Sequence, residues 1–124
     1  MVNTPLVSVV DDDESVRESL RGLIRSVGFR VEAFASAAAF SSSEQLGETD
    51  CLILDVRMPG TNGLELQRQL AASEHHIPII FITAHGSDEG VRSRALRDGA
   101  VAYLTKPFSE EALLEAINSA VTAK

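Results

Sequence analysis

Short apolar runs alternate with amphipathic stretches along the chain, and the alternation repeats about five times. Four of these runs predict strands because apolar residues fill nearly every position. They are Leu6–Val10, Cys51–Leu54, Pro78–Ile82 and Val101–Leu104. The second and third of them are uniformly apolar, as expected for strands buried on both faces of a sheet. A fifth run, Phe29–Phe34, alternates apolar with polar residues and therefore predicts a strand at the edge of the sheet.

Helical spacing of apolar residues marks the stretches between the predicted strands. Apolar residues from Val16 to Val27 lie on one face of a helix that begins near Asp13 and is closed by Gly28. Further helices are predicted over Ser36–Ser43, from Leu64 to Leu70, from about Val91 to Asp98, and from Ser109 to Val121. Strands alternating with helices predict an α/β fold, with a parallel sheet covered by helices on both faces. The length suits a single domain over residues 1–124.

Polar side chains follow the predicted strands at the points where a parallel sheet places its chemistry. They are Asp11, Asp12 and Asp13 after the first strand, Asp55 after the third, Thr83 after the fourth, and Thr105 and Lys106 after the fifth. Each of these residues taken alone is more often a cap, a turn residue or a surface charge. Because all four inner strand ends carry such residues in one alternating pattern, we expect several carboxylates, one hydroxyl and one ammonium group to share one pocket.

The expected pocket holds more negative than positive charge. Carboxylates about 4 Å apart repel by roughly 4 kcal/mol at an effective dielectric constant near 20, so a cluster of them needs protons or cations. Lys106 supplies one positive charge, and the remaining need favours Mg²⁺, a hard ion that takes oxygen ligands. Asp55 stands alone at its strand end and can serve as a nucleophile toward a phosphoryl group that Mg²⁺ and Lys106 neutralise.

Charge and composition narrow the choice of partner and compartment. The chain has 11 basic and 18 acidic residues, a net charge of −7, which argues against direct binding of nucleic acid. The single cysteine, Cys51, excludes an internal disulfide framework and favours a reducing compartment. No apolar run is long enough to span a bilayer and the first residues lack a signal-peptide pattern, so we expect a cytoplasmic protein without membrane contact.

At this point the chain resembles the receiver domain of two-component response regulators over essentially its whole length. The segments that carry the resemblance are VVDDD from Val9, LDVRMPG from Leu54, ITA from Ile82 and LTKPF from Leu104. Details at Arg57–Gly60 and at His85-Gly86 are most similar to the FixJ/NarL-type transcriptional regulators. The resemblance implies a flavodoxin-like fold with five parallel strands in the order 2-1-3-4-5.

The resemblance also implies a role for each matching residue. Asp55 corresponds to the phosphoacceptor, and Lys106 to the family's ammonium group, with a cis bond to Pro107. The residues implied to hold Mg²⁺, for which Mn²⁺ can substitute, are Asp11, Asp12, Asp55 and Arg57, the last through its main-chain carbonyl. Thr83 and Tyr103 correspond to the switch pair, in which the hydroxyl turns toward the phosphoryl group and the ring moves in behind it. Arg57, Ala84 and His85 occupy positions that modulate the site. Asp13 is expected to act locally as a helix cap.

The implied function is signalling rather than turnover of a substrate. A sensor histidine kinase would supply the phosphoryl group, and the domain would assist its own phosphorylation and autodephosphorylation without being an enzyme in the ordinary sense. Phosphorylation would remodel the surface formed by the helix at Val91–Asp98, the strand at Val101–Leu104 and the helix from Ser109. That surface could then support a homodimer and control a transcriptional output domain that this chain does not contain.

Three other functions remain as alternatives. A phosphatase of the haloacid dehalogenase type needs a second aspartate two residues after its nucleophile, where this chain has Arg57. A nucleotide-binding switch needs a glycine-rich loop after the first strand, where this chain has Asp11–Glu14. A receiver-like module that is never phosphorylated would not require the full set of acidic, hydroxyl and ammonium groups.

Overall fold

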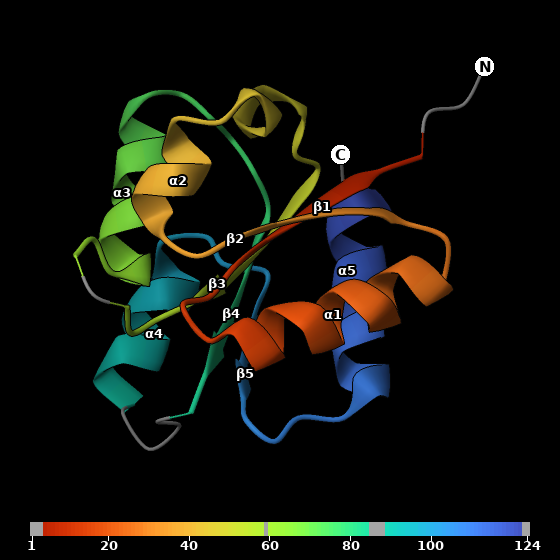
Figure 1. The fold of residues 1–124 in the computed structure, drawn as a ribbon. Helices are drawn as coiled ribbons and strands as arrows, with labels where there is room; N and C mark the ends of the chain where they lie inside the picture. Colours follow the sequence, from red (N-terminus) through yellow and green to blue (C-terminus); the bar gives the residue numbers. More distant parts are fainter. Residues whose placement is uncertain (1–3, 59, 85–88, 123–124) are drawn as a thin grey trace.

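Five parallel strands form one sheet in the order β2-β1-β3-β4-β5, with helices on both faces (Figure 1). The structure is a computed structural model, and it describes residues 4–58, 60–84 and 89–122. The strands are β1 (Leu6–Val10), β2 (Arg30–Phe34), β3 (Cys51–Asp55), β4 (Ile79–Thr83) and β5 (Ala102–Thr105). The helices are α1 (Glu14–Ser26), α2 (Ala37–Ser41), the 3₁₀ helix η1 (Glu44–Glu48), α3 (Gly63–Ala72), α4 (Glu89–Arg97) and α5 (Glu110–Thr122). The predicted fold class and strand order are confirmed.

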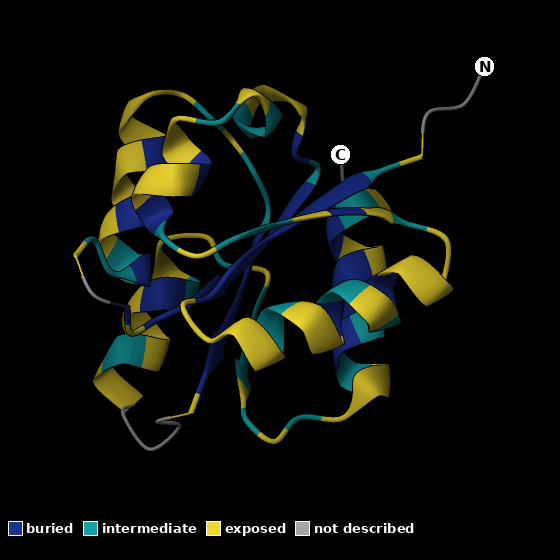
Figure 2. Cartoon of the chain, viewed as in Figure 1, coloured by how far each residue is buried: buried dark blue, intermediate teal, exposed yellow. Residues whose placement is uncertain are grey.

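The inner strands are buried along their whole length. Every residue of β1, β3 and β4 is buried, as their nearly unbroken apolar sequences predict. In β2 only Val31 is fully buried, which agrees with its predicted place at the sheet edge. Figure 2 shows the same division, with dark blue strands in the interior and exposed positions on the outer faces of the helices.

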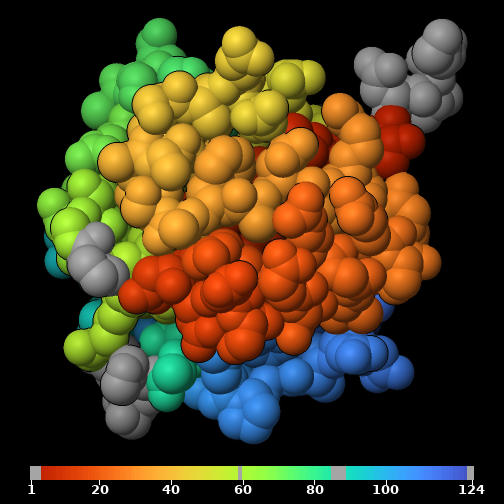
Figure 3. Space-filling view, in the orientation of Figure 1, coloured from red at the N-terminus to blue at the C-terminus, as the bar shows by residue number. Residues whose placement is uncertain are grey.

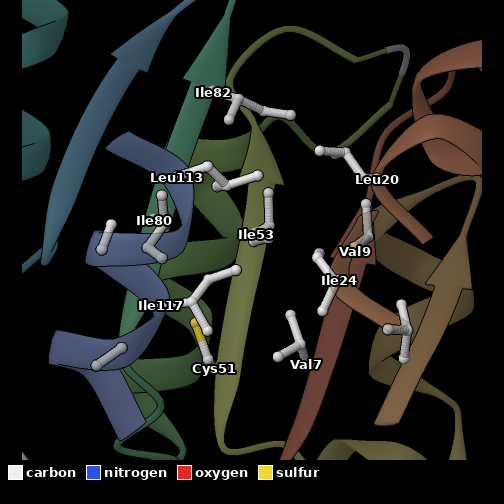
Figure 4. Close-up of a cluster of buried hydrophobic side chains, with 13 residues drawn as sticks. Val7, Val9, Leu20, Ile24, Cys51, Ile53, Ile80, Ile82, Leu113 and Ile117 are labelled. Atoms are coloured by element: carbon white, nitrogen blue, oxygen red, sulfur yellow. The ribbon is translucent and has the colours of Figure 1, made fainter. Parts of the chain in front are cut away.

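The sheet separates two apolar cores. Alternate residues of each strand point to opposite faces, so Ile53 and its neighbour Leu54 belong to different cores. One core lies under α1 and α5 and is drawn in Figure 4; it includes Val7, Val9, Leu20, Ile24, Cys51, Ile53, Ile80, Ile82, Leu113 and Ile117. The other lies under α2, α3 and α4 and includes Phe40, Leu52, Leu54, Leu66, Leu70, Phe81, Ala95 and Tyr103. Because apolar side chains pack on both faces of the sheet, the strands are held in register and their carboxyl ends are fixed in place.

Several helix boundaries differ from those expected from the sequence. The helix α3 begins at Gly63, one residue before the expected start, because Asn62 caps it. The helix α4 begins at Glu89 rather than near Val91. The predicted helix over Ser36–Ser43 is shorter, since Ser36 is its N-cap, and η1 follows where no element was expected. None of the helices in the described part of the chain combines the length and apolar composition needed to cross a bilayer.

Truncating a side chain at the centre of the sheet should cost much of the stability. Ile53 has no solvent exposure, so we expect Ile53→Ala to lower the free energy of unfolding by about 2–5 kcal/mol. Val27 is 47% exposed, and Val27→Ala should change it by no more than about 0.5 kcal/mol. Urea denaturation of both variants measures the difference. Equal losses in the two variants would contradict the described core.

Candidate functional site

Three carboxylates meet at the carboxyl end of the sheet. Asp11 directly follows β1, Asp55 is the last residue of β3, and Asp12 lies at the surface beside them. One carboxylate oxygen from each of the three lies within 4.8 Å of the others. Asp11 is fully buried and Asp55 is 7% exposed, so two of these charges are largely withdrawn from water. The structure therefore brings together three of the four acids that the strand-end pattern singled out.

One ammonium group balances part of this charge. Lys106 follows β5, and its Nζ lies 3.2 Å from Oδ2 of Asp11. The main-chain N–H of Lys106 also donates to the carbonyl oxygen of Thr83 at 2.7 Å, which ties the end of β5 to the end of β4. The Lys106–Pro107 peptide bond is cis, as the resemblance implies. A single positive charge among three acids leaves the cluster net negative.

Asp11 is held in place from several directions. Its Oδ1 accepts a hydrogen bond from the main-chain N–H of Asp13 at 2.9 Å, while its other carboxylate oxygen meets Lys106. Its main-chain carbonyl accepts a hydrogen bond from Nη1 of Arg17 at 2.8 Å, and its N–H donates to Phe34 at 3.1 Å. Nothing in the amphipathic pattern of α1 distinguishes Arg17 from a surface arginine, so the sequence does not predict this contact.

Asp13 lies outside this cluster and caps a helix, as expected. Its Oδ1 accepts hydrogen bonds from the main-chain N–H of Ser15 at 2.9 Å and from the Ser15 hydroxyl at 2.7 Å. These bonds stabilise the ionised carboxylate and lower the pKa of Asp13. The run of acids after β1 therefore divides into two residues at the site and one that begins α1.

The carboxyl group of Asp55 is shifted in the opposite direction. Burial, and then the neighbouring negative charge of Asp11, raise the pKa of Asp55 to about 6. The positive charge of Lys106 and a hydrogen bond from the N–H of Arg57 to Oδ1 of Asp55, 3.3 Å long, oppose this shift. Asp55 therefore loses its proton less readily than an exposed aspartate, and a cation bound nearby would offset this cost.

The donor set fits Mg²⁺. This ion prefers hard oxygen ligands, few carboxylates and partial hydration, and the cluster offers three carboxylates, one of them exposed. Among the residues that the structure describes, the cluster includes no histidine or cysteine side chain of the kind that softer transition metals favour. The residues present are therefore chemically suited to the ion that the strand-end pattern predicts.

The other predicted site residues lie along β4 and β5. Thr83 is the last residue of β4 and is 1% exposed, and Ala84 after it is exposed. Tyr103 pairs with Phe81 in the parallel register, and its buried ring lies 6.3 Å, centroid to centroid, from the ring of Phe81. The ring is therefore already inside the protein in this structure. Arg57 is exposed beside Asp55, and His85 lies outside the described residues.

Comparison with known proteins decides the family. The model of the response regulator receiver domain family matches residues 7–118, which is most of the chain. The chain belongs to the response regulator receiver domain family. Receiver domains are signalling domains of two-component systems, interact with histidine kinases, and are typically phosphorylated with Mg²⁺.

Individual relatives agree with this assignment. The receiver domain is 50% identical to nodulation protein W of Bradyrhizobium diazoefficiens over 115 residues, which are 93% of this chain and 50% of that protein. A solved structure of the response regulator StyR matches with a TM-score of 0.90 and 51% identity, over 98% of this chain and 61% of that one. The crystal structure of FixJ-N matches with a TM-score of 0.87 and 35% identity, over 99% of this chain and 98% of that one. The predicted likeness to FixJ-type regulators is confirmed, and the chain spans about half the length of the curated relatives it matches.

The raised pKa of Asp55 predicts a pH-dependent cost to stability. Without metal, the native state of the receiver domain holds a proton on Asp55 up to about pH 6, whereas the unfolded chain loses it near pH 3.8. The contribution of Asp55 to the free energy of unfolding therefore falls as the pH rises from 3.8 to about 6. We expect Asp55→Asn to be more stable than the original protein at pH 7–8 by about 1–2 kcal/mol, after discounting for solvent screening. The advantage should vanish near pH 4.

Urea denaturation in chelator-treated buffer at several pH values measures this effect. Asp98→Asn removes the same formal charge at an exposed position and serves as the control. A difference between Asp55→Asn and the original protein that stays constant from pH 4 to pH 8 would contradict the shift.

Proposed function

We propose that this receiver domain accepts a phosphoryl group on Asp55 from a histidine kinase, with Mg²⁺ held by Asp11, Asp12, Asp55 and the main-chain carbonyl of Arg57. The observation that carries the proposal is the meeting of three carboxylates within 4.8 Å beside the Lys106 ammonium group. An acidic cluster with one ammonium suits the transfer of an anionic group only if a cation offsets the remaining charge.

The proposed transfer uses the carboxylate of Asp55, the ammonium group of Lys106 and Mg²⁺. Asp55 is mostly ionised at neutral pH, because its pKa of about 6 lies below 7. One of its carboxylate oxygens attacks the phosphorus of a phosphohistidine in line, the phosphorus–nitrogen bond breaks, and its electron pair returns to the imidazole nitrogen. The Lys106 ammonium group binds an oxygen of the transferring group. Mg²⁺, when bound, neutralises the charge that develops on the phosphoryl oxygens.

A groove beside the site suits the approach of the kinase. It has a volume of about 300 Å³ and is bordered by Lys106, by apolar residues of α1 such as Leu20, and by Phe108. Figure 3 shows α1, in red-orange, lying against the blue segment that leads into α5. Because the groove is continuous with Lys106, a kinase helix seated there would hold its phosphohistidine close to Asp55.

The response to phosphorylation would pass along β4 and β5. The Thr83 hydroxyl would donate a charge-assisted hydrogen bond to the new phosphoryl group. The ring of Tyr103, which is already buried, would then stabilise one arrangement of the α4, β5 and α5 surface. We propose that this surface forms a homodimer and controls transcription through parts of the protein beyond this chain. Support comes from relatives named as transcriptional regulators, such as FixJ of Azorhizobium caulinodans, which is 41% identical over 115 residues.

The remaining roles follow from charge and exposure. The net charge of −7 supports a receiver domain that does not itself bind nucleic acid. The side chains of Arg57 and Ala84 are exposed next to the acceptor, where they would tune autodephosphorylation by controlling the access of water. The family match ends inside α5, which continues to Thr122, so we propose that the domain takes in the whole range 1–124.

Labelling with a small acyl phosphate tests the acceptor. Incubation with acetyl phosphate and Mg²⁺ should add one phosphoryl group to the original protein and none to Asp55→Asn, because an amide cannot replace the carboxylate nucleophile. Asp98→Asn should be labelled like the original protein. Intact-protein mass spectrometry reads the result, and undiminished labelling of Asp55→Asn would place the acceptor elsewhere.

The neighbouring acids Asp12 and Asp13 form a matched pair for testing the metal. Asp12→Asn should weaken Mg²⁺ binding by roughly tenfold or more, since even the loss of an outer-shell partner typically costs about 10- to 100-fold. Asp13→Asn changes the same charge one residue away and keeps a helix cap, so its Mg²⁺ affinity should be nearly unchanged.

Isothermal titration gives both affinities, and chelator should stop phosphorylation until Mg²⁺ or Mn²⁺ is restored. Equal Mg²⁺ affinities in the two variants would contradict the proposed ligand set, as would full phosphorylation in chelator.

A further inference from the structure

The first turn of α3 packs directly against the main chain of the acceptor residue. Gly63, the first residue of α3, is buried, and a Cβ atom placed on it would lie 2.6 Å from the main-chain oxygen of Asp55. The same Cβ would lie 3.1 Å from Cα of Val56 and 3.1 Å from Cε1 of Phe81. Real Cβ atoms essentially never approach a neighbour closer than 3.0 Å, so any side chain here requires a movement.

The closest neighbour of this Cβ position, the main-chain oxygen of Asp55, cannot move without the strand end that carries it. The Phe81 ring is a side chain and can shift, whereas the oxygen of Asp55 belongs to the main chain at the end of β3. Moving it displaces the residue whose carboxylate lies in the acidic cluster.

The backbone of residues 55–57 is held from two sides. On the sheet side, the N–H of Val56 donates to the carbonyl of Ile82 at 3.2 Å. On the helix side, the N–H of Gly63 donates to the carbonyl of Val56 at 2.9 Å. Between these contacts, the N–H of Arg57 reaches Oδ1 of Asp55. The position of α3 therefore bears on the main chain of the acceptor residue and on the Val56–Arg57 peptide, which directly precedes the Arg57 carbonyl.

Local backbone conformation does not explain this glycine. Gly28, Gly60 and Gly99 have positive φ angles, whereas Gly63 does not. Within a helix, glycine is less favourable than alanine, so helix stability alone would select a side chain here. Close approach to Asp55 is the reason that the structure supplies.

We propose that Gly63 is a positioning residue for phosphoryl transfer. Its missing side chain lets α3 seat deeply enough to set the position of the Asp55 carboxylate and of the Arg57 carbonyl. The proposal rests on the proposed function for the reaction it serves. The packing contact itself does not depend on that function.

The test compares Gly63→Ala with Gly22→Ala. Gly22 also lies in a helix, but a Cβ atom there meets nothing within 4 Å. In Gly63→Ala the contact must open by at least about 0.4 Å, from 2.6 Å to 3.0 Å. Because a displacement of about 1 Å can cost about a hundredfold in rate, we expect labelling by acetyl phosphate to slow by roughly tenfold. We also expect a several-fold loss of Mg²⁺ affinity, whereas Gly22→Ala should match the original protein in both.

A double variant separates the ring from the main chain. Adding Phe81→Leu to Gly63→Ala removes the contact with Cε1 but leaves the clash with the Asp55 oxygen. The double variant should stay as slow as Gly63→Ala relative to Phe81→Leu alone. Recovery of the rate in the double variant would overturn the proposal, as would an unchanged rate, or an unchanged Mg²⁺ affinity, in folded Gly63→Ala.

Two further measurements keep the test decisive. If Gly63→Ala does not fold, Asn62→Ala loosens the same helix start by removing its cap, and Asn62→Ser restores a cap. Asn62→Ala should slow labelling and Asn62→Ser should restore it, and equal rates in both would overturn the proposal.

If the original protein takes up no phosphoryl group, the proposed function fails. Crystal structures of the two glycine variants then show whether Asp55 moves only in Gly63→Ala, and an unmoved Asp55 would overturn the positioning role.

Discussion

The repulsion among three carboxylates at one corner of the sheet is the constraint on which the structure depends. Two acids about 4 Å apart repel by roughly 4 kcal/mol at an effective dielectric constant near 20, and here three lie within 4.8 Å with one ammonium beside them. The chain tolerates this because two apolar cores, one on each face, hold the strands in register. Burial of β1, β3 and β4 thus stabilises a charge arrangement that would not form alone.

The same rigidity gives the site its chemistry. Asp11 is held through its carboxylate, its carbonyl and its N–H, so it cannot turn away from Asp55. Burial, and then the repulsion from Asp11, raise the pKa of Asp55, which makes a cation and then a phosphoryl group at this corner favourable partners. Thr83 lies on the strand next to Asp55 and is tied to Lys106 through the main chain. Under the proposed function, a change of charge at the acceptor would therefore act first on β4 and β5.

The sequence predicts most of the fold because consecutive apolar residues mark buried strands and alternation at Phe29–Phe34 marks an edge. It also places the acids of the site, since strand ends of a parallel sheet share one edge. The strand order is implied by the family resemblance and not by the periodicity. Other features depend on packing between distant segments. The helix η1 lacks an apolar repeat, the Arg17 bond to Asp11 depends on how α1 sits against β1, and the role of Gly63 depends on the approach of α3 to Asp55.

The most direct test of the central claim is the location of a divalent ion in crystals grown with Mn²⁺, recorded by its anomalous scattering. The account predicts one peak at coordination distance from carboxylate oxygens of Asp11, Asp12 and Asp55 and from the main-chain carbonyl of Arg57, lost when Asp12 is replaced by Asn but kept when Asp13 is. An ion bound elsewhere, or a cluster that keeps its geometry and binds no ion at millimolar Mn²⁺, would contradict it.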